Sequence, residues 1–247
     1  MLQRVLITTL SLLAFSAAVV HADPKDDIQA AIQKLSDSGN YSWTRTVEGG
    51  FGRGPQNGKI QKDGTTWLSV QMRDNTYELL TQGDKAAVKT DDGWKSKAEL
   101  TTAAASDDGG GPPSPERMLL FMVQNIKAPA DLAKDLVSKL DNIQKTDDGY
   151  SADLTPDAAK EQLMFRRRRA TTTPDANAPA VEVKDAKASI KFTIKDGNLT
   201  KFEMHVTGTR SFNGNDNDVD QTTTTEIKDV GTTTIDVPAD AKAKLGA

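Results

Sequence analysis

The stretch that decides the fold is AKASIKFTIKDGNLTKFEMHVTGT, residues 186–209. Each of its halves alternates apolar and polar residues with a period of two, which is the period of a β-strand with one buried face. Asp196-Gly197 stands between the halves and is a strong hairpin signal. The predicted apolar face carries Ile190, Phe192, Ile194, Phe202, Met204 and Val206, and the other face carries Lys191, Lys195, Glu203 and His205.

Strands are expected on both sides of this hairpin. Between residues 41 and 96, short alternating segments are separated by turn signals such as Asp63-Gly64 and Gly83-Asp84, which is typical of an antiparallel meander. Further strands are predicted around 142–146, around 149–154, in DQTTTTEIKDV (220–230) and in TTTIDVP (232–238).

Helices are expected in two places. Asp23-Pro24 is an N-cap followed by a proline at the first helical position, and apolar residues then recur at helical spacing as far as Ser36. In the middle of the chain, helices are predicted around MLLFMV (118–123), from Pro129, and from Pro156 to about Phe165. The sequence therefore predicts an α+β fold: a curved, unclosed antiparallel half-barrel with an N-terminal helix and inserted helices that cover its concave face.

The N-terminal segment, 1–22, has the pattern of a secretory signal peptide. Arg4 precedes an apolar stretch, and Val20-His21-Ala22 is a small-x-small cleavage pattern. An uncleaved membrane anchor is the alternative, although the apolar run is short for a span. The chain contains no cysteine, so it has neither disulfides nor thiolate metal sites. We expect a single domain over residues 23–247, located in the periplasm or secreted.

The sequence gives little sign of catalysis. His205 is the only histidine after the leader, and the common hydrolase and metalloprotease motifs are absent. The formal net charge of −4 does not favour a nucleic-acid binder. We therefore expect a non-enzymatic protein without cofactor or metal, whose contact with a membrane is at most peripheral.

The apolar helix around 118–123 has two interpretations. A helix that is apolar all round is normally buried, so core packing is the simpler one. The other is a lid over a hydrophobic cavity, in which Met118, Phe121 and Met122 adapt to an irregular ligand. A continuous void beneath the helix would favour the lid.

The concave face is the predicted binding site. The residues expected to line it are Trp43, Trp67, Phe192, Met204 and Val206. The expected ligand is a lipid or the acyl chain of a lipoprotein, held by apolar burial. The alternative is an envelope protein-interaction module whose concavity is filled by its own helices.

Arg166 to Arg169 form a basic cluster. Arginines at a solvated helix end are the simpler interpretation. Alternatively, Arg166 and Arg167 contact anionic head groups or an acidic patch of a partner protein.

SFNGNDNDVDQTTTTE (211–226) is rich in oxygen donors and resembles a calcium loop at first sight. Starting an EF-hand loop at Asp216 puts Gln221 where glycine is needed, and starting it at Asn215 puts Val219 at a ligand position. We interpret the stretch as the solvated tip of a long hairpin, and only weak surface binding of calcium at 213–220 stays open.

The order of elements resembles that of the periplasmic lipoprotein-carrier superfamily, which includes the lipoprotein-localisation factor and mycobacterial lipid-binding relatives. The resemblance rests on the helix over 24–36 leading into YSWTRTV, on GKIQK at 58–62, and on the closing TEIKDVGTTTIDVPADAKAKL. The long C-terminal strands also resemble those of secreted planctomycete-type proteins. The resemblance implies a half-barrel that carries lipophilic molecules. It also implies a head-group or partner contact for Arg45, because the localisation factor carries a functional arginine in its first strand.

Overall fold

The computed structural model describes most of the chain after the predicted leader. The described residues are 23–49, 54–72, 75–105, 114–164, 182–212 and 214–246. The predicted signal peptide over residues 1–22 lies outside them.

One antiparallel sheet of eleven strands organises the described residues. Its strand order is β6-β5-β4-β3-β2-β1-β11-β10-β9-β8-β7. The N-terminal half consists of β1 (Tyr41–Glu48), β2 (Gln56–Ile60), β3 (Thr66–Met72), β4 (Asn75–Gln82), β5 (Lys85–Thr90) and β6 (Gly93–Ser96). The C-terminal half consists of β7 (Leu140–Thr146), β8 (Gly149–Leu154), β9 (Glu182–Lys195), β10 (Asn198–Phe212) and β11 (Asn215–Lys228).

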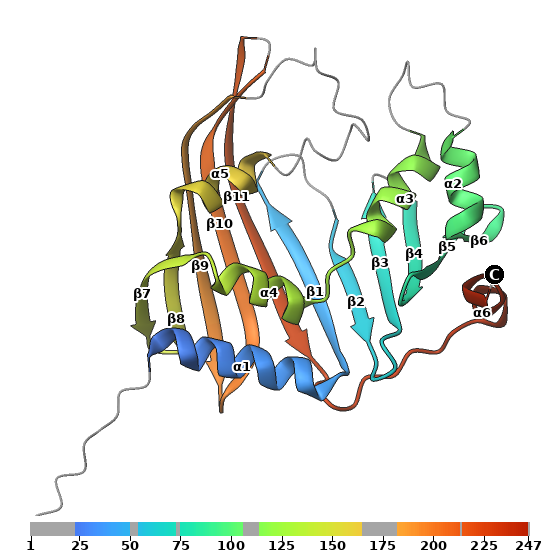
Figure 1. Cartoon of the computed structure of the whole chain (residues 1–247), viewed down its shortest axis with the longest axis horizontal. Coiled ribbons are helices and arrows are strands. Elements are labelled where there is room, and N and C mark those ends of the chain that lie inside the picture. The colour runs from blue at the N-terminus through green and yellow to red at the C-terminus, as the bar shows by residue number, and fades with distance from the viewer. Residues whose placement is uncertain are drawn as a thin grey trace, which may run out of the picture.

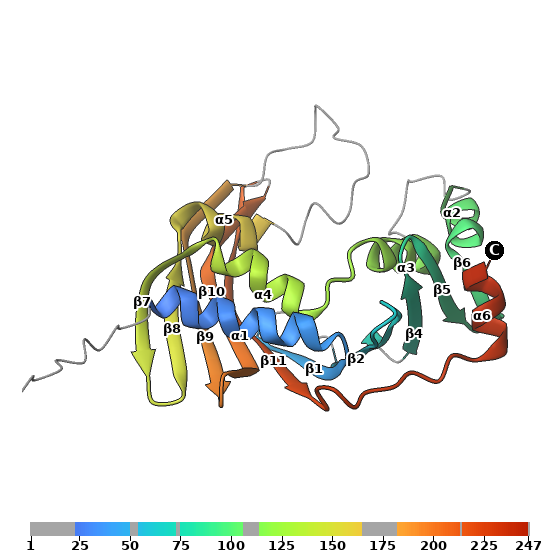
Figure 2. The ribbon, with the colours of Figure 1, turned by 60° about the horizontal axis from the view of Figure 1, so that its bottom comes forward.

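The two halves meet at the centre of the sheet, where β1 pairs with β11. β6 and β7 lie at opposite ends of the strand order, so the sheet does not close into a barrel. Figures 1 and 2 show the sheet curving around the helices. The predicted α+β fold with an unclosed antiparallel half-barrel is therefore confirmed.

The hairpin at Asp196-Gly197 forms as predicted. Asp196 has a φ of 51 and Gly197 a φ of 70 degrees. Positive φ at both central residues is what a type I′ turn requires. β9 and β10 then pair over almost their whole length, with Phe192 opposite Phe202. Their register is interrupted near Thr200 and near Gly208, where the ladder contains a bulge or an irregularity.

The four predicted helices of the described residues pack on one face of the sheet, which we call the inner face (Figure 2). α1 (Pro24–Ser38) begins at Asp23, whose side chain accepts a hydrogen bond from Lys25 N, and ends at Gly39, whose backbone is left-handed. The other three are α3 (Pro115–Gln124), α4 (Pro129–Val137) and α5 (Pro156–Met164). α1 lies against α4, and both bury apolar side chains in the main core.

Two further helices were not predicted. α2 (Lys97–Ala105) packs against α3. α6 (Ala239–Gly246) covers the opposite face of the sheet, which we call the outer face, where Ala241 and Leu245 bury Leu80 and Ala87. The prediction of a last strand over 232–238 is wrong, because this segment runs in irregular conformation to α6 (Figure 1).

Candidate functional site

The strand registers determine which side chains share the inner face. Ile227 of β11 lies opposite Trp43, which lies opposite Gly58 of β2. Gly58 in turn lies opposite Leu68, and Leu68 opposite Leu79. Because partners directly opposite each other project to the same side of a sheet, these residues form one row on the inner face.

Three of the predicted lining residues are packed into the core of this face. Trp43 is only 3 % exposed, Phe192 is completely buried, and Val206 is buried as well. The rings of Phe192 and Phe202 lie 6.3 Å apart between centroids. Met204 differs from them, because it is only half-buried while it packs on the same core.

Trp67 lies on the outer face, so the prediction that it shares a face with Trp43 is wrong. It pairs with Leu80 and packs with α6 and the segment before it. Its indole Nε1 donates a hydrogen bond of 3.3 Å to Glu78, and Lys59 Nζ lies 5.7 Å from its ring centroid. Trp67 therefore belongs to a second core and not to a concave lining.

α3 is neither wholly buried nor detached from the sheet. Leu119 and Val123 are buried in the main core, whereas Phe121 and Met122 are half-buried. Met118 is 37 % exposed. The helix is thus anchored by one side, and three of its apolar side chains remain accessible to different degrees.

Arg45 projects from β1 to the inner face. Its Nε donates to Thr225 Oγ1 at 3.3 Å and its Nη1 donates to Gln56 Oε1 at 3.4 Å. Thr225 is completely buried, so the guanidinium of Arg45 contacts a buried polar side chain on an otherwise apolar face. Such a group presents directed N–H donors that suit carboxylate or phosphate oxygens.

Beyond Arg45, several side chains on the inner face of the central strands are only half-buried. We call this region the inner strip; it consists of Arg45, Val47, Met204, Gln221 and Thr223. Thr223 lies opposite both Val47 and Met204, and Gln221 lies opposite Val206. The strip therefore combines apolar and polar side chains in adjacent positions.

Sequence reasoning missed Gln56, Gln221 and Thr223 as neighbours of Arg45 and Met204. It also missed Arg210, a half-buried residue whose Nε is buried without a hydrogen-bond partner among the described residues. The alternation within QTTTTE contained part of the signal, since every second residue must share the face of Ile227. Arg166 and Arg167 lie outside the described residues.

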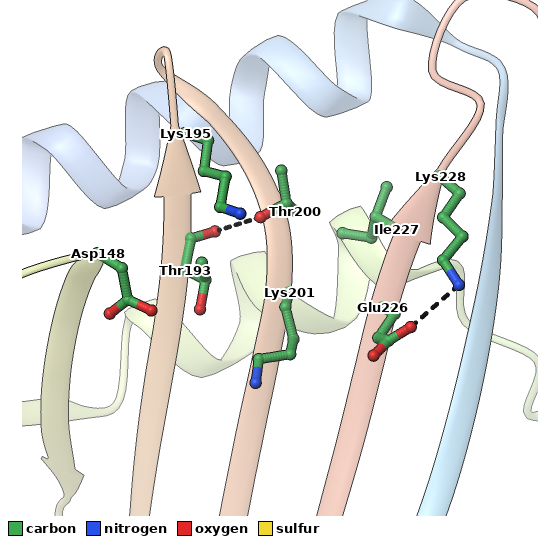
Figure 3. Close-up of a pocket in the computed structure, with 8 residues that line it drawn as sticks. All are labelled: Asp148, Thr193, Lys195, Thr200, Lys201, Glu226, Ile227 and Lys228. Atoms are coloured by element: carbon green, nitrogen blue, oxygen red, sulfur yellow. Dashed lines mark hydrogen bonds and ion pairs between the residues drawn. The ribbon is translucent and has the colours of Figure 1, made fainter.

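The outer face carries a shallow pocket of about 280 Å³ near the β9–β10 turn (Figure 3). Its walls come from β9, β10 and β11 and from Asp148 in the turn between β7 and β8. The residues around it are Asp148, Thr193, Lys195, Thr200, Lys201, Glu226, Ile227 and Lys228.

The row of aspartates in the C-terminal hairpin also lies on the outer face. Asp218 accepts a hydrogen bond from Thr209 at 2.7 Å, and Asp220 lies 2.8 Å from His205 Nε2. Asp216 accepts from Ser211, which lowers the pKa of this carboxyl below its usual range. Each of these carboxylates thus already interacts with a side chain of β10.

Two tyrosines join the inner helices to the sheet. The Tyr41 hydroxyl accepts a hydrogen bond from Ala130 N at 3.3 Å, and burial raises its pKa to about 12. The Tyr150 hydroxyl donates to Asp27 of α1, and this hydrogen bond raises the pKa of Tyr150 to about 12.

The part of the chain that the structure describes contains no group of three or more acidic, histidine or cysteine side chains placed to hold a metal ion. Within the same residues, no helix is long and apolar enough to cross a membrane.

The fold and the inner face define a class: an α+β fold in which an open antiparallel sheet curves around its helices. One solved structure with a similar arrangement is the Mycobacterium tuberculosis lipoprotein LppX, with a TM-score of 0.44 and 11 % sequence identity. The alignment covers 86 % of this chain and 98 % of LppX. No protein-family model and no curated protein matches the sequence.

Proposed function

We propose that this is a non-catalytic protein that binds the apolar part of a lipid, or of an acylated protein, along the inner strip. The observation that carries the proposal is that Met204 and Val47, on either side of Thr223, are only half-buried, whereas Phe202 and Val206 on the same face are buried. A methionine fits irregular apolar surfaces because its side chain is unbranched and polarizable. Met118, Phe121 and Met122 of α3 would add apolar contacts at the rim of the same face.

Arg45 supplies the polar end of the proposed site. A bound lipid with an acidic head group would exchange water for charge-assisted hydrogen bonds to the guanidinium, which Thr225 and Gln56 hold in place. Arg166 and Arg167 follow α5 in the sequence, and we propose that they contact head groups or a partner protein at the membrane surface.

The predicted leader over residues 1–22 supports a role outside the cytoplasm. We propose that the chain acts in the periplasm or after secretion, with at most peripheral contact with a membrane.

The experiment incubates the chain from Asp23 onward with liposomes and detects acquired lipid by native mass spectrometry. Met204→Asp places a charge on the inner strip, whereas Ser189→Asp places the same charge on the exposed side of the neighbouring strand β9. The proposal expects lipid on the unaltered chain and on Ser189→Asp, and its loss in Met204→Asp and Met118→Asp. Failure of the unaltered chain to acquire any lipid would refute it.

A protein-interaction module is the second candidate, and the packing of α1 and α4 favours it. Ile28 and Ala133 are completely buried, so these helices already fill the part of the inner face beneath them. The same lipid experiment separates the candidates, since an interaction module should stay free of lipid in every variant.

A further inference from the structure

We propose that the pocket on the outer face binds a small oxyanion, a phosphate or carboxylate group. The pocket and the inner strip lie on opposite faces of the sheet, so this inference does not depend on the proposed function. Figure 3 shows its lining residues around the ends of β9, β10 and β11, with α1 behind the sheet.

The pocket arises where β10 separates from β11. Pairing between these strands ends at Lys201 and Glu226, although β11 continues to Lys228 alongside β1. Thr200 is the extra residue of an irregularity between Leu199 and Lys201, which disrupts the ladder at this position. The hollow is therefore part of the sheet itself, at a place where the pairing of its strands is interrupted.

Positive charge at the pocket is not fully neutralised. Among the ion pairs of the described residues none involves Lys195, and Lys201 meets a carboxylate only at 3.8 Å, on Glu203. The two acidic residues of the pocket are already engaged: Glu226 lies 3.1 Å from Lys228, and Asp148 lies 3.2 Å from Lys191. Lys195 and Lys201 thus remain to attract an anion.

One buried hydroxyl group completes the set of donors. Thr193 lines the pocket, is only 5 % exposed, and its Oγ1 has no hydrogen-bond partner among the described residues. Thr200 Oγ1 donates to the carbonyl oxygen of Thr193 at 3.2 Å. Its one hydrogen is therefore already used, so Thr200 forms part of the polar lining and is not counted as a donor to the anion. An unpartnered buried hydroxyl beside two ammonium groups fits a compact acceptor of several hydrogen bonds.

The chemistry favours a compact anion over an extended one. Glu226 and Asp148 also line the pocket and would repel a second, distant negative charge, so a single phosphate or carboxylate group near Lys195 and Lys201 is favoured. Lys195 is exposed and Lys201 is partly exposed, so we expect a dissociation constant on the order of a millimolar, which rises as salt screens the charges.

The test titrates the unaltered chain with inorganic phosphate at low salt and follows backbone amide shifts by NMR. We expect saturable shifts at Thr193, Thr200 and Lys201, which the double variant Lys195→Gln and Lys201→Gln abolishes. Lys187→Gln is the matched control, because Lys187 is an exposed lysine of β9 outside the pocket. Thr193→Val should weaken binding about fivefold while leaving the fold intact, because it removes a hydroxyl without a partner in the described residues.

A second arm distinguishes a free anion from a lipid head group. Sedimentation with vesicles of an anionic phospholipid should show binding that the double lysine variant loses if the natural ligand is a head group, and no such difference if it is a free anion. The inference is overturned if phosphate causes no saturable shift and the variants bind vesicles as the unaltered chain does.

Discussion

The indole ring of Trp43 occupies the space that a side chain at residue 58 would need. A Cβ added to Gly58 would lie 2.1 Å from two atoms of the ring. The absence of a side chain on β2 thus allows a tryptophan of β1 to lie over the neighbouring strand and to be buried there.

Gly58→Ala should therefore destabilise the fold by about 1–3 kcal/mol, because the ring must move within a packed core. Urea unfolding followed by tryptophan fluorescence measures this difference. Asn57 is exposed on the same strand and provides the control. Asn57→Ala should change the free energy of unfolding by at most about 0.5 kcal/mol, as is usual for a surface substitution. Equal stability of the two variants would contradict the packing described here.

The two tyrosines predict a loss of stability at alkaline pH. Their pKa values in the folded chain are raised from 10.0 to about 12, so the unfolded chain loses these protons first as the pH rises. The stabilisation is complete below pH 10 and is lost between about pH 10 and 12. Urea unfolding across this range should show the decline, and Tyr150→Phe should make it shallower. A variant with the same pH dependence as the unaltered chain would contradict the contribution of Tyr150.

α6 predicts a contrast between two alanines of one helix. Ala241 is completely buried against the outer face, whereas Ala243 is exposed. Ala241→Asp should cost about 2–4 kcal/mol, because it buries a carboxylate without a partner. Ala243→Asp introduces the same group at the surface and should be nearly neutral. Thermal unfolding compares them, and similar melting temperatures would show that α6 does not seal the second core.

Calcium should leave the protein unchanged. The carboxylates of Asp218 and Asp220 lie in a strand and contact Thr209 and His205, so they do not converge on one point. Calorimetric titration should give no heat of binding, and the melting temperature should be the same with calcium and with a chelator. A saturable rise in melting temperature would restore the calcium interpretation.

The sequence was sufficient for the elements whose signals are local. Asp196-Gly197 predicted the central hairpin, and the cap at Asp23 predicted the first helix. The side of the sheet on which Trp67 lies was also accessible, because a period of two groups it with Ser69 and separates it from the buried Leu68 and Val70. The alternation along β3, and not the aromatic character of Trp67, determines the face on which this side chain lies.

Other features depended on distant contacts. The β-branched residues of TTTIDVP favour a strand, but both sides of β1 and β11 are already paired, so no central position is left for it. Hydrogen bonds from Asn40 Nδ2 to Thr233 O and from Ile235 N to Gln61 Oε1 hold this segment as a connection to α6 instead. The inner strip likewise arises from registers between strands that are far apart in the sequence.

The central pairing of β1 with β11 imposes an order on folding. Ser42 donates a hydrogen bond of 2.6 Å to Asp229, a residue 187 positions later in the chain. While the chain is being synthesised, β1 can pair with β2, but its other edge stays unpaired until β11, near the end of the sequence, has been made. Pairing between strands so far apart in the sequence forms slowly. Until it forms, the unpaired edge of β1 can pair with other chains. We therefore expect the N-terminal half of the nascent chain to need protection from aggregation until β11 has been synthesised and pairs with β1.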